Sequence, residues 1–106
     1  MEKRKPHYPL ERVKLLIRQG AFRVTRTALE DAVRDFGLVG SGQLLEHVLA
    51  LTPADFRKSM TTLHDHTLWQ DVYHKTVTGA AAYVKVQIVN DGTVIISFKQ
   101  LEVDER

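Results

Sequence analysis

Hydrophobic residues recur at helical spacing near the start of the chain. Between Pro9 and Gly20 they lie one to three positions apart on one helical face, at Leu10, Val13, Leu16 and Ile17. Proline in the first turn and glycine after the last turn are typical of helix ends. The pattern predicts a first helix between Pro9 and Gly20, and the alternation of residues 22–24 then predicts a short strand.

Two more helices are predicted between residues 27 and 49. Thr27 and Glu30 have the spacing of a capping box, and Gly37 ends this second helix. Ser41 is expected to cap the third helix, and residues 52–55 predict one further helical turn. The expected buried positions are Ala28, Leu29, Ala32, Val33 and Phe36 in the second helix and Leu44, Leu45, Val48 and Leu49 in the third.

The second half of the chain changes to the alternation of β-strands. Residues 82–89 alternate between an apolar set and a more polar set, residues 93–100 follow with a second alternating run, and Asn90-Asp91-Gly92 between them is a strong turn signal. A three-residue loop, with Gly92 in the left-handed conformation, gives the hairpin one fully apolar face. The expected apolar pairs are Val84 with Phe98, Val86 with Ile96 and Ile88 with Val94, and the pairs on the other face are Tyr83 with Lys99 and Lys85 with Ser97.

Helices followed by a hairpin predict an α+β fold, with N-terminal helices packed on one face of a small antiparallel sheet. At 106 residues the chain is expected to form a single domain, residues 1–106. Its 43% hydrophobic and 26% charged residues are typical of a soluble globular protein. No cysteine, secretory signal or membrane-length apolar run is visible, so we expect a cytoplasmic protein without contact to a membrane.

Residues 58–73 stand out because their apolar residues follow neither the helical period nor the alternation of a long strand. They contain the only Trp, together with Lys, Gln, Asp and several hydroxyl side chains. Residues 56–100 also hold five basic and three acidic residues, so positive charge collects in this half of the chain. A polar segment of this kind is typical of chemistry or recognition, and the charge suits a polyanionic partner, although an ordinary solvated surface explains the charge equally well.

This segment resembles the centre of the MqsR family of toxins, which are mRNA interferases of type II toxin–antitoxin systems. The resemblance rests on Lys58-Ser59-Met60-Thr61-Thr62, Asp65-His66-Thr67 and Trp69-Gln70-Asp71-Val72-Tyr73. It extends to Met1-Glu2-Lys3-Arg4 with Pro6-His7, Val24-Thr25-Arg26, Val77-Thr78-Gly79 and Ser97-Phe98-Lys99, so it covers almost the whole chain. It implies a RelE-like toxin fold and an endoribonuclease activity.

The resemblance also implies the site. Lys58, Gln70 and Tyr83 match the catalytic set of the family, and Lys99 matches a lysine beside that set. The implied reaction is a metal-independent cleavage of single-stranded mRNA by the ribose 2′-hydroxyl, which leaves a 2′,3′-cyclic phosphate, with a preference for a short motif beginning with G and C. The implied partner is an antitoxin with a zinc-binding half and a helix-turn-helix half. No cofactor or metal is expected in this chain.

The side chains fit the three tasks of such a reaction, which are to accept the 2′-proton, hold the phosphoryl oxygens and protonate the leaving oxygen. Lysine and tyrosine titrate near pH 10, so we assign Lys58 and Lys99 mainly to the phosphate and Tyr83 to the 2′-hydroxyl. Gln70 would hold the phosphate or a base edge. Lys85 is a further candidate for substrate binding, as is Arg57, although Arg57 is equally well explained as a solvated side chain.

Histidines offer a rival chemistry in the same segment. Imidazole is better matched to pH 7 than lysine or tyrosine, so a pair among His64, His66 and His74 could act as acid and base. His66 lies in the matched Asp-His-Thr run and is a candidate for substrate binding, or alternatively for a hydrogen bond that orders the loop. These residues fit no recognised metal-ligand spacing. Trp69 could stack on a base, but packing is the more common role of a single tryptophan.

Two functions from other classes remain open at this point. A non-catalytic RNA- or ribosome-binding module would use the same basic face and bind RNA without cutting it. A protein-interaction domain would pair through an exposed sheet edge and show no affinity for RNA.

Overall fold

The computed structural model describes residues 1–102, which form helices and one sheet. The helices are α1 (Leu10–Arg18), α2 (Arg26–Phe36), α3 (Gly40–Leu49) and a 3-10 turn, η1 (Pro53–Asp55). The strands are β1 (Glu2–Lys3), β2 (Phe22–Val24), β3 (Phe56–Thr61), β4 (Trp69–Val77), β5 (Ala80–Val89) and β6 (Gly92–Gln100). The sheet order is β1-β3-β4-β5-β6-β2, antiparallel except where β2 pairs with β6.

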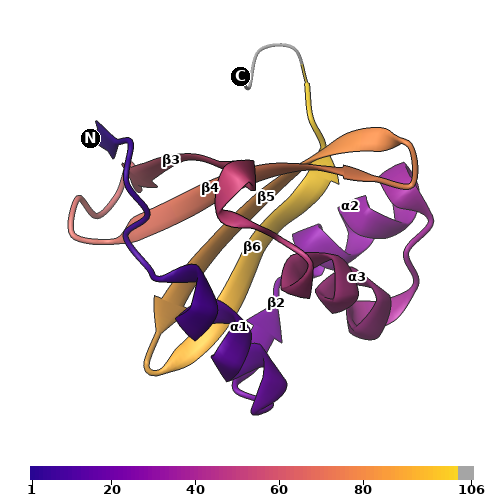
Figure 1. Ribbon diagram of the computed structural model, residues 1–106, viewed down its shortest axis with the longest axis horizontal. Coiled ribbons are helices and arrows are strands. Elements are labelled where there is room, and N and C mark those ends of the chain that lie inside the picture. The colour runs from indigo at the N-terminus through magenta and orange to yellow at the C-terminus, as the bar shows by residue number, and fades with distance from the viewer. Residues whose placement is uncertain (103–106) are drawn as a thin grey trace.

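The three helices lie on the same side of the sheet (Figure 1). Their apolar stripes pack against the side chains of β4, β5 and β6 that point toward them, and the rings of Phe36 and Phe98 meet edge to face at 5.6 Å. The predicted α+β fold, with helices on one face of the sheet, is therefore confirmed. Within residues 1–102, no helix is both long enough and apolar enough to cross a membrane.

The predicted helices are present, but two of their starts are wrong. The hydroxyl of Thr25, two residues before Thr27, accepts the bond from the N–H of Ala28 at 3.1 Å, so α2 begins earlier than the capping box indicated. In α3, Ser41 lies inside the helix, and the side chain of Gln43 accepts a bond from the N–H of Val39. The predicted end of α2 is confirmed, since Gly37 has a φ of 68°.

Two further expectations about the helices have different outcomes. Val33 of α2 is 48% exposed, so its predicted burial is wrong. The turn predicted at residues 52–55 is confirmed as η1, where Thr52 and Asp55 form a capping box.

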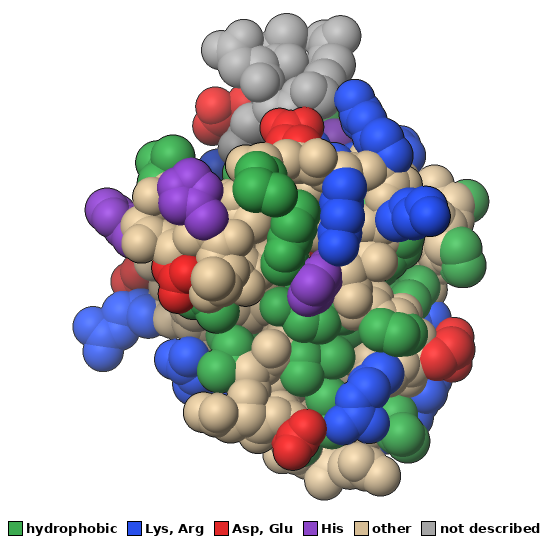
Figure 2. Space-filling view, turned by 90° about the vertical axis from the view of Figure 1, so that its left-hand side faces the viewer, with side chains coloured by type: hydrophobic (Ala, Val, Ile, Leu, Met, Phe, Trp, Pro, Cys, Tyr) green, Lys and Arg blue, Asp and Glu red, His purple; other side chains and the backbone are tan. Residues whose placement is uncertain are grey.

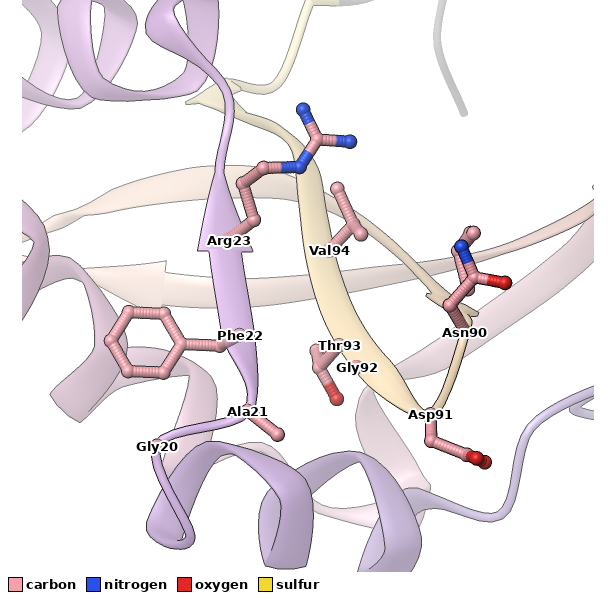
Figure 3. A pocket seen from close by; sticks show the side chains of 10 residues that line it. Gly20, Ala21, Phe22, Arg23, Asn90, Asp91, Gly92, Thr93 and Val94 are labelled. Carbon is pink, nitrogen blue, oxygen red and sulfur yellow. The ribbon is translucent and has the colours of Figure 1, made fainter.

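The β5–β6 hairpin follows the predicted register at its open end and departs from it near the turn. Tyr83 lies opposite Lys99 and Lys85 opposite Ser97, as predicted. The turn, however, has two residues, Asn90 and Asp91, and both have positive φ, at 52° and 59°. Gly92, which was expected to be left-handed, pairs with Val89 as the first residue of β6 (Figure 3).

A β-bulge in β6 compensates for the tighter turn. The register shifts between Lys85 and Val86, so Val86 lies opposite Ile95 instead of Ile96, and Ile88 lies opposite Thr93 instead of Val94. Two-residue turns with positive φ match the right-handed twist of the strands, and one extra residue then returns the following side chains to their faces. Alternation alone could not show where that extra residue lies.

Residues 58–73, which show no period in the sequence, form the paired strands β3 and β4 and the loop between them. The period is hidden because polar side chains occupy buried positions: Ser59 and Asp71 are both 0% exposed. The N-terminal segment covers Asp71. The carboxylate of Asp71 accepts hydrogen bonds from the backbone N–H groups of His7 at 3.1 Å and Tyr8 at 2.9 Å.

Candidate active site

The sheet face that points away from the helices carries most of the predicted site residues, and we call it the open face. Residues opposite one another on neighbouring strands point to the same side of a sheet. Lys58, Val72 and Lys85 form one such row across β3, β4 and β5, and His74, Tyr83 and Lys99 form the next row across β4, β5 and β6. The residues that point to the open face from β3 to β6 include Lys58, Met60, Gln70, Val72, His74, Tyr83, Lys85, Gln87, Ser97 and Lys99.

Tyr83 lies at the centre of a cluster of nitrogen-containing side chains. The ammonium nitrogens of Lys99 and Lys85 lie 5.4 and 5.7 Å from the centre of its ring. The ring of His74 lies 5.9 Å away, and Tyr83 is only 7% exposed. The expected meeting of a phenol with two ammonium groups on one face is therefore present, in a more enclosed position than an exposed strand residue would have.

Lys58 lies two strands from Tyr83 and two residues along the sheet. With strands about 4.8 Å apart and about 3.4 Å per residue, their Cα atoms are roughly 12 Å apart. A long lysine side chain and a tyrosine side chain can therefore reach opposite sides of one substrate group. The Lys58 amine is paired with Glu2 of β1 at 3.5 Å, and 23% of the Lys58 side chain is exposed. Nothing in the sequence pattern indicated this carboxylate, because it comes from the other end of the chain.

A β-bulge explains how two consecutive basic residues reach the same face. The register of β3 against β4 shifts between Phe56 and Lys58, which leaves Arg57 as the extra residue. Successive residues normally point to opposite faces, but a bulge redirects one of them. Arg57 therefore reaches the open face, where its Nε donates to His74 Nδ1 at 3.2 Å. Of the three histidines considered as acid or base, His74 is the one that lies in the site, opposite Tyr83 and bonded to Arg57.

Gln70 lies at the end of the open face nearest the β3–β4 loop. Its side-chain nitrogen donates to the side-chain oxygen of Gln87 on β5 at 3.2 Å, in a partly buried position. Gln87 belongs to the alternating run of residues 82–89, and its contact with Gln70 depends on the strand register.

His66 is not among the residues of the open face. It is exposed in the loop of residues 62–68, with His64. The hydrogen bonds that order this loop are made by Asp65 instead. Its carboxylate accepts a bond from the N–H of Thr67 at 2.8 Å, and the backbone N–H of Asp65 donates to the hydroxyl of Thr62 at 3.0 Å. The bonds from Thr67 also lower the pKa of the Asp65 carboxyl. In the part of the chain that the structure describes, no three His, Asp or Glu side chains are grouped to hold a metal ion.

Trp69 points to the side of the sheet opposite Gln70, where the N-terminal segment packs on it. The imidazole of His7 stacks on the indole at 5.4 Å, and Lys3 Nζ lies 4.2 Å from the ring centre. Burial and the neighbouring Lys3 lower the pKa of His7. The packing role of Trp69 is therefore the one that these contacts support. The N-terminal segment and the β3–β4 loop lie at the edge of the molecule that Figure 2 faces, where hydrophobic side chains are interspersed with Lys and Arg.

Comparison with known proteins gives two matches. Residues 5–100 match the family described as "Motility quorum-sensing regulator, toxin of MqsA". The chain is also 43% identical over 100 residues to the mRNA interferase toxin MqsR of Escherichia coli (strain K12), an alignment that covers 94% of this chain and 99% of that protein. The aligned stretch therefore includes the strands that form the open face.

Proposed function

This chain belongs to the MqsR family of toxins, and from that premise we propose that it is an mRNA interferase that cleaves single-stranded mRNA at the open face. The observation that carries the proposal is that Lys58, Gln70, Tyr83 and Lys99 all point to the same face of the sheet. These residues come from four different strands and share the face that the helices leave uncovered. Arg57 and Lys85 add two more cations for the RNA backbone.

In the proposed reaction, the ribose 2′-oxygen attacks the adjacent phosphorus while the bond from phosphorus to the 5′-oxygen breaks. The products are a 2′,3′-cyclic phosphate and a 5′-hydroxyl, whose oxygen takes its proton from the ammonium group of Lys58 or Lys99. Tyr83 accepts or orients the 2′-proton, and the ammonium groups of Lys85 and Lys99 near its ring stabilise the negative charge that develops there. Lys58 stabilises the phosphoryl oxygens and releases Glu2 when RNA binds. Gln70 orients the substrate through neutral hydrogen bonds.

The proposed partner is a cognate antitoxin, because the matched family is described as the toxin of MqsA. The antitoxin is proposed to carry a zinc-binding half and a helix-turn-helix half, so that the zinc belongs to the partner. The proposed cleavage motif begins with G and C. We also propose that His66, which is exposed in the β3–β4 loop, contacts the part of the RNA that extends beyond the open face.

A cleavage assay on a defined single-stranded RNA tests the proposal. We expect cleavage in the presence of EDTA, a cyclic phosphate on the upstream fragment, and no reaction when the scissile nucleotide carries a 2′-deoxyribose. Salt-dependent binding without cleavage would instead identify a non-catalytic RNA-binding module, and loss of activity in EDTA would favour a metal-dependent reaction at the histidines.

A further inference from the structure

Gln70 and Gln87 form a side-chain pair across β4 and β5. Asp71 of β4 lies opposite Val86 of β5. Because the strands are antiparallel, Gln70 and Gln87 lie opposite each other in the next row. In that row Gln70 Nε2 donates to Gln87 Oε1 at 3.2 Å. Both side chains are partly exposed, so the pair lies on the surface where RNA is proposed to bind.

The direction of this hydrogen bond determines which atom Gln70 offers to a substrate. A glutamine side chain carries one acceptor oxygen and one donor nitrogen on the same planar group, and rotation of its last torsion exchanges them easily. Because Nε2 of Gln70 is turned toward Gln87, its Oε1 points away from Gln87. Phosphate oxygens only accept hydrogen bonds, so they could use only the second N–H of Gln70 Nε2, whereas the outward Oε1 cannot bind them. It suits an N–H or O–H group, such as a base amino group or a ribose hydroxyl.

We propose that Gln87 is a positioning residue that holds Gln70 with its oxygen toward the substrate, so that Gln70 recognises a hydrogen-bond donor of the RNA. This inference rests on the proposed function, since it assumes that Gln70 contacts RNA. It narrows the RNA group that Gln70 is expected to contact, from a phosphate or a base edge to a group that donates a hydrogen bond. It also gives a role in the reaction to Gln87, which makes no contact with the reacting atoms itself.

Three substitutions of Gln87 separate orientation from charge. In Gln87→Glu, the carboxylate can only accept, so it keeps the Gln70 nitrogen and leaves the oxygen outward. In Gln87→Lys, the ammonium can only donate, so it attracts the Gln70 oxygen and turns the nitrogen outward. Gln87→Met has a similar length and makes neither bond.

We expect kcat of Gln87→Glu to stay within about twofold of the wild type, while KM rises because the new negative charge repels phosphate. We expect kcat to fall about threefold to tenfold in Gln87→Met and at least tenfold in Gln87→Lys, without a rise in KM for the lysine variant. A purely electrostatic effect would give the opposite order, with Gln87→Lys faster than Gln87→Glu. That order, or a wild-type kcat for Gln87→Met, would overturn the inference.

A second measurement does not depend on cleavage. The side-chain amide protons of Gln70, followed by NMR, should exchange with water more slowly in the wild type and Gln87→Glu than in Gln87→Met. Equal exchange rates in all three would overturn the inference. Slow exchange together with absence of RNA cleavage by the wild type would show that the pair exists while the proposed function fails, so the two failures are distinguishable. The midpoint temperature of thermal unfolding of each variant should stay within a few degrees of the wild-type value.

Discussion

Tyr83 lies directly opposite Lys99 on the neighbouring strand, and the Lys99 ammonium nitrogen is 5.4 Å from the centre of the Tyr83 ring. Lys85 lies two residues after Tyr83 on β5, and its ammonium nitrogen is 5.7 Å from the centre of the same ring. A phenol between two cations is suited to hold a group that becomes negatively charged. RNA bound at this site, as we propose, should therefore have an affinity that depends on salt.

We predict that Lys85→Ala and Lys99→Ala each weaken RNA binding and each reduce the slope of log affinity against log salt by about 0.7, the amount for one lost contact to single-stranded phosphate. Fluorescence anisotropy with an RNA that carries a 2′-deoxyribose at the scissile position measures this without cleavage. Lys75→Ala is the matched control, because Lys75 lies on β4 but points to the other side of the sheet. An unchanged slope for both open-face variants would place the RNA elsewhere.

The buried carboxylate of Asp71 leads to a prediction about stability. It is 0% exposed and accepts hydrogen bonds from the N–H groups of His7 and Tyr8, which attaches the N-terminal segment to β4. Hydrogen bonds to a charged group contribute more than neutral ones, so Asp71→Ala should lower the free energy of unfolding by about 3 kcal/mol. Urea denaturation measures the change, with Glu46→Ala as a control, because Glu46 is exposed on α3 and its loss should cost less than about 0.5 kcal/mol. Equal effects of the two substitutions would contradict this account of the N-terminal segment.

The hairpin turn provides a test of backbone conformation. Asn90 has a φ of 52°, whereas Gly92 has no positive φ and a side chain there would meet only ordinary contacts, the nearest being Val89 O at 3.5 Å. Gly92→Ala should therefore change the free energy of unfolding by less than about 0.5 kcal/mol, and Asn90→Ala should lower it by about 1 kcal/mol. If Gly92→Ala were the more damaging substitution, the three-residue turn predicted from the sequence would be the correct one.

These cases show which parts of the molecule its sequence could predict. The helices and the β5–β6 pairing follow from apolar periods, and the facing of Tyr83 and Lys99 follows from alternation. The remaining geometry depends on bulges and on contacts between distant parts of the chain. The bulge that redirects Arg57, the pairing of Glu2 with Lys58 and the bond between Gln70 and Gln87 are of this kind. Local pattern carries no information about them, because each depends on how separate strands are registered.

The buried phenol of Tyr73 leads to a prediction about how the free energy of unfolding changes at alkaline pH. Burial, and to a lesser extent the charge of Asp71, raise the pKa of Tyr73 well above its usual value of 10. Above pH 10 the phenol ionises in the unfolded chain but stays neutral in the folded protein, so ionisation favours unfolding. The stability that the neutral phenol provides is therefore present below pH 10 and is lost as the pH rises above it.

Tyr73→Phe should reduce this loss, because Phe does not ionise. The free energy of unfolding, measured by urea denaturation between pH 9 and 11.5, should fall less steeply in Tyr73→Phe than in the wild type. Parallel curves for the two proteins would mean that Tyr73 ionises equally easily in both states.

The central claim is that Lys58 and Tyr83 act together in one RNA-cleaving site on the open face. Cleavage rates of one defined RNA at saturating enzyme test it most directly, comparing Lys58→Ala and Tyr83→Phe with Lys75→Ala, which removes the same charge from the other face of the sheet. We predict a fall of at least 100-fold for the first two variants, in keeping with the loss of a group that acts in the transition state, and a wild-type rate for the third. All three should keep a folded circular dichroism spectrum. Wild-type rates in folded Lys58→Ala and Tyr83→Phe would contradict the assignment of the open face as the active site.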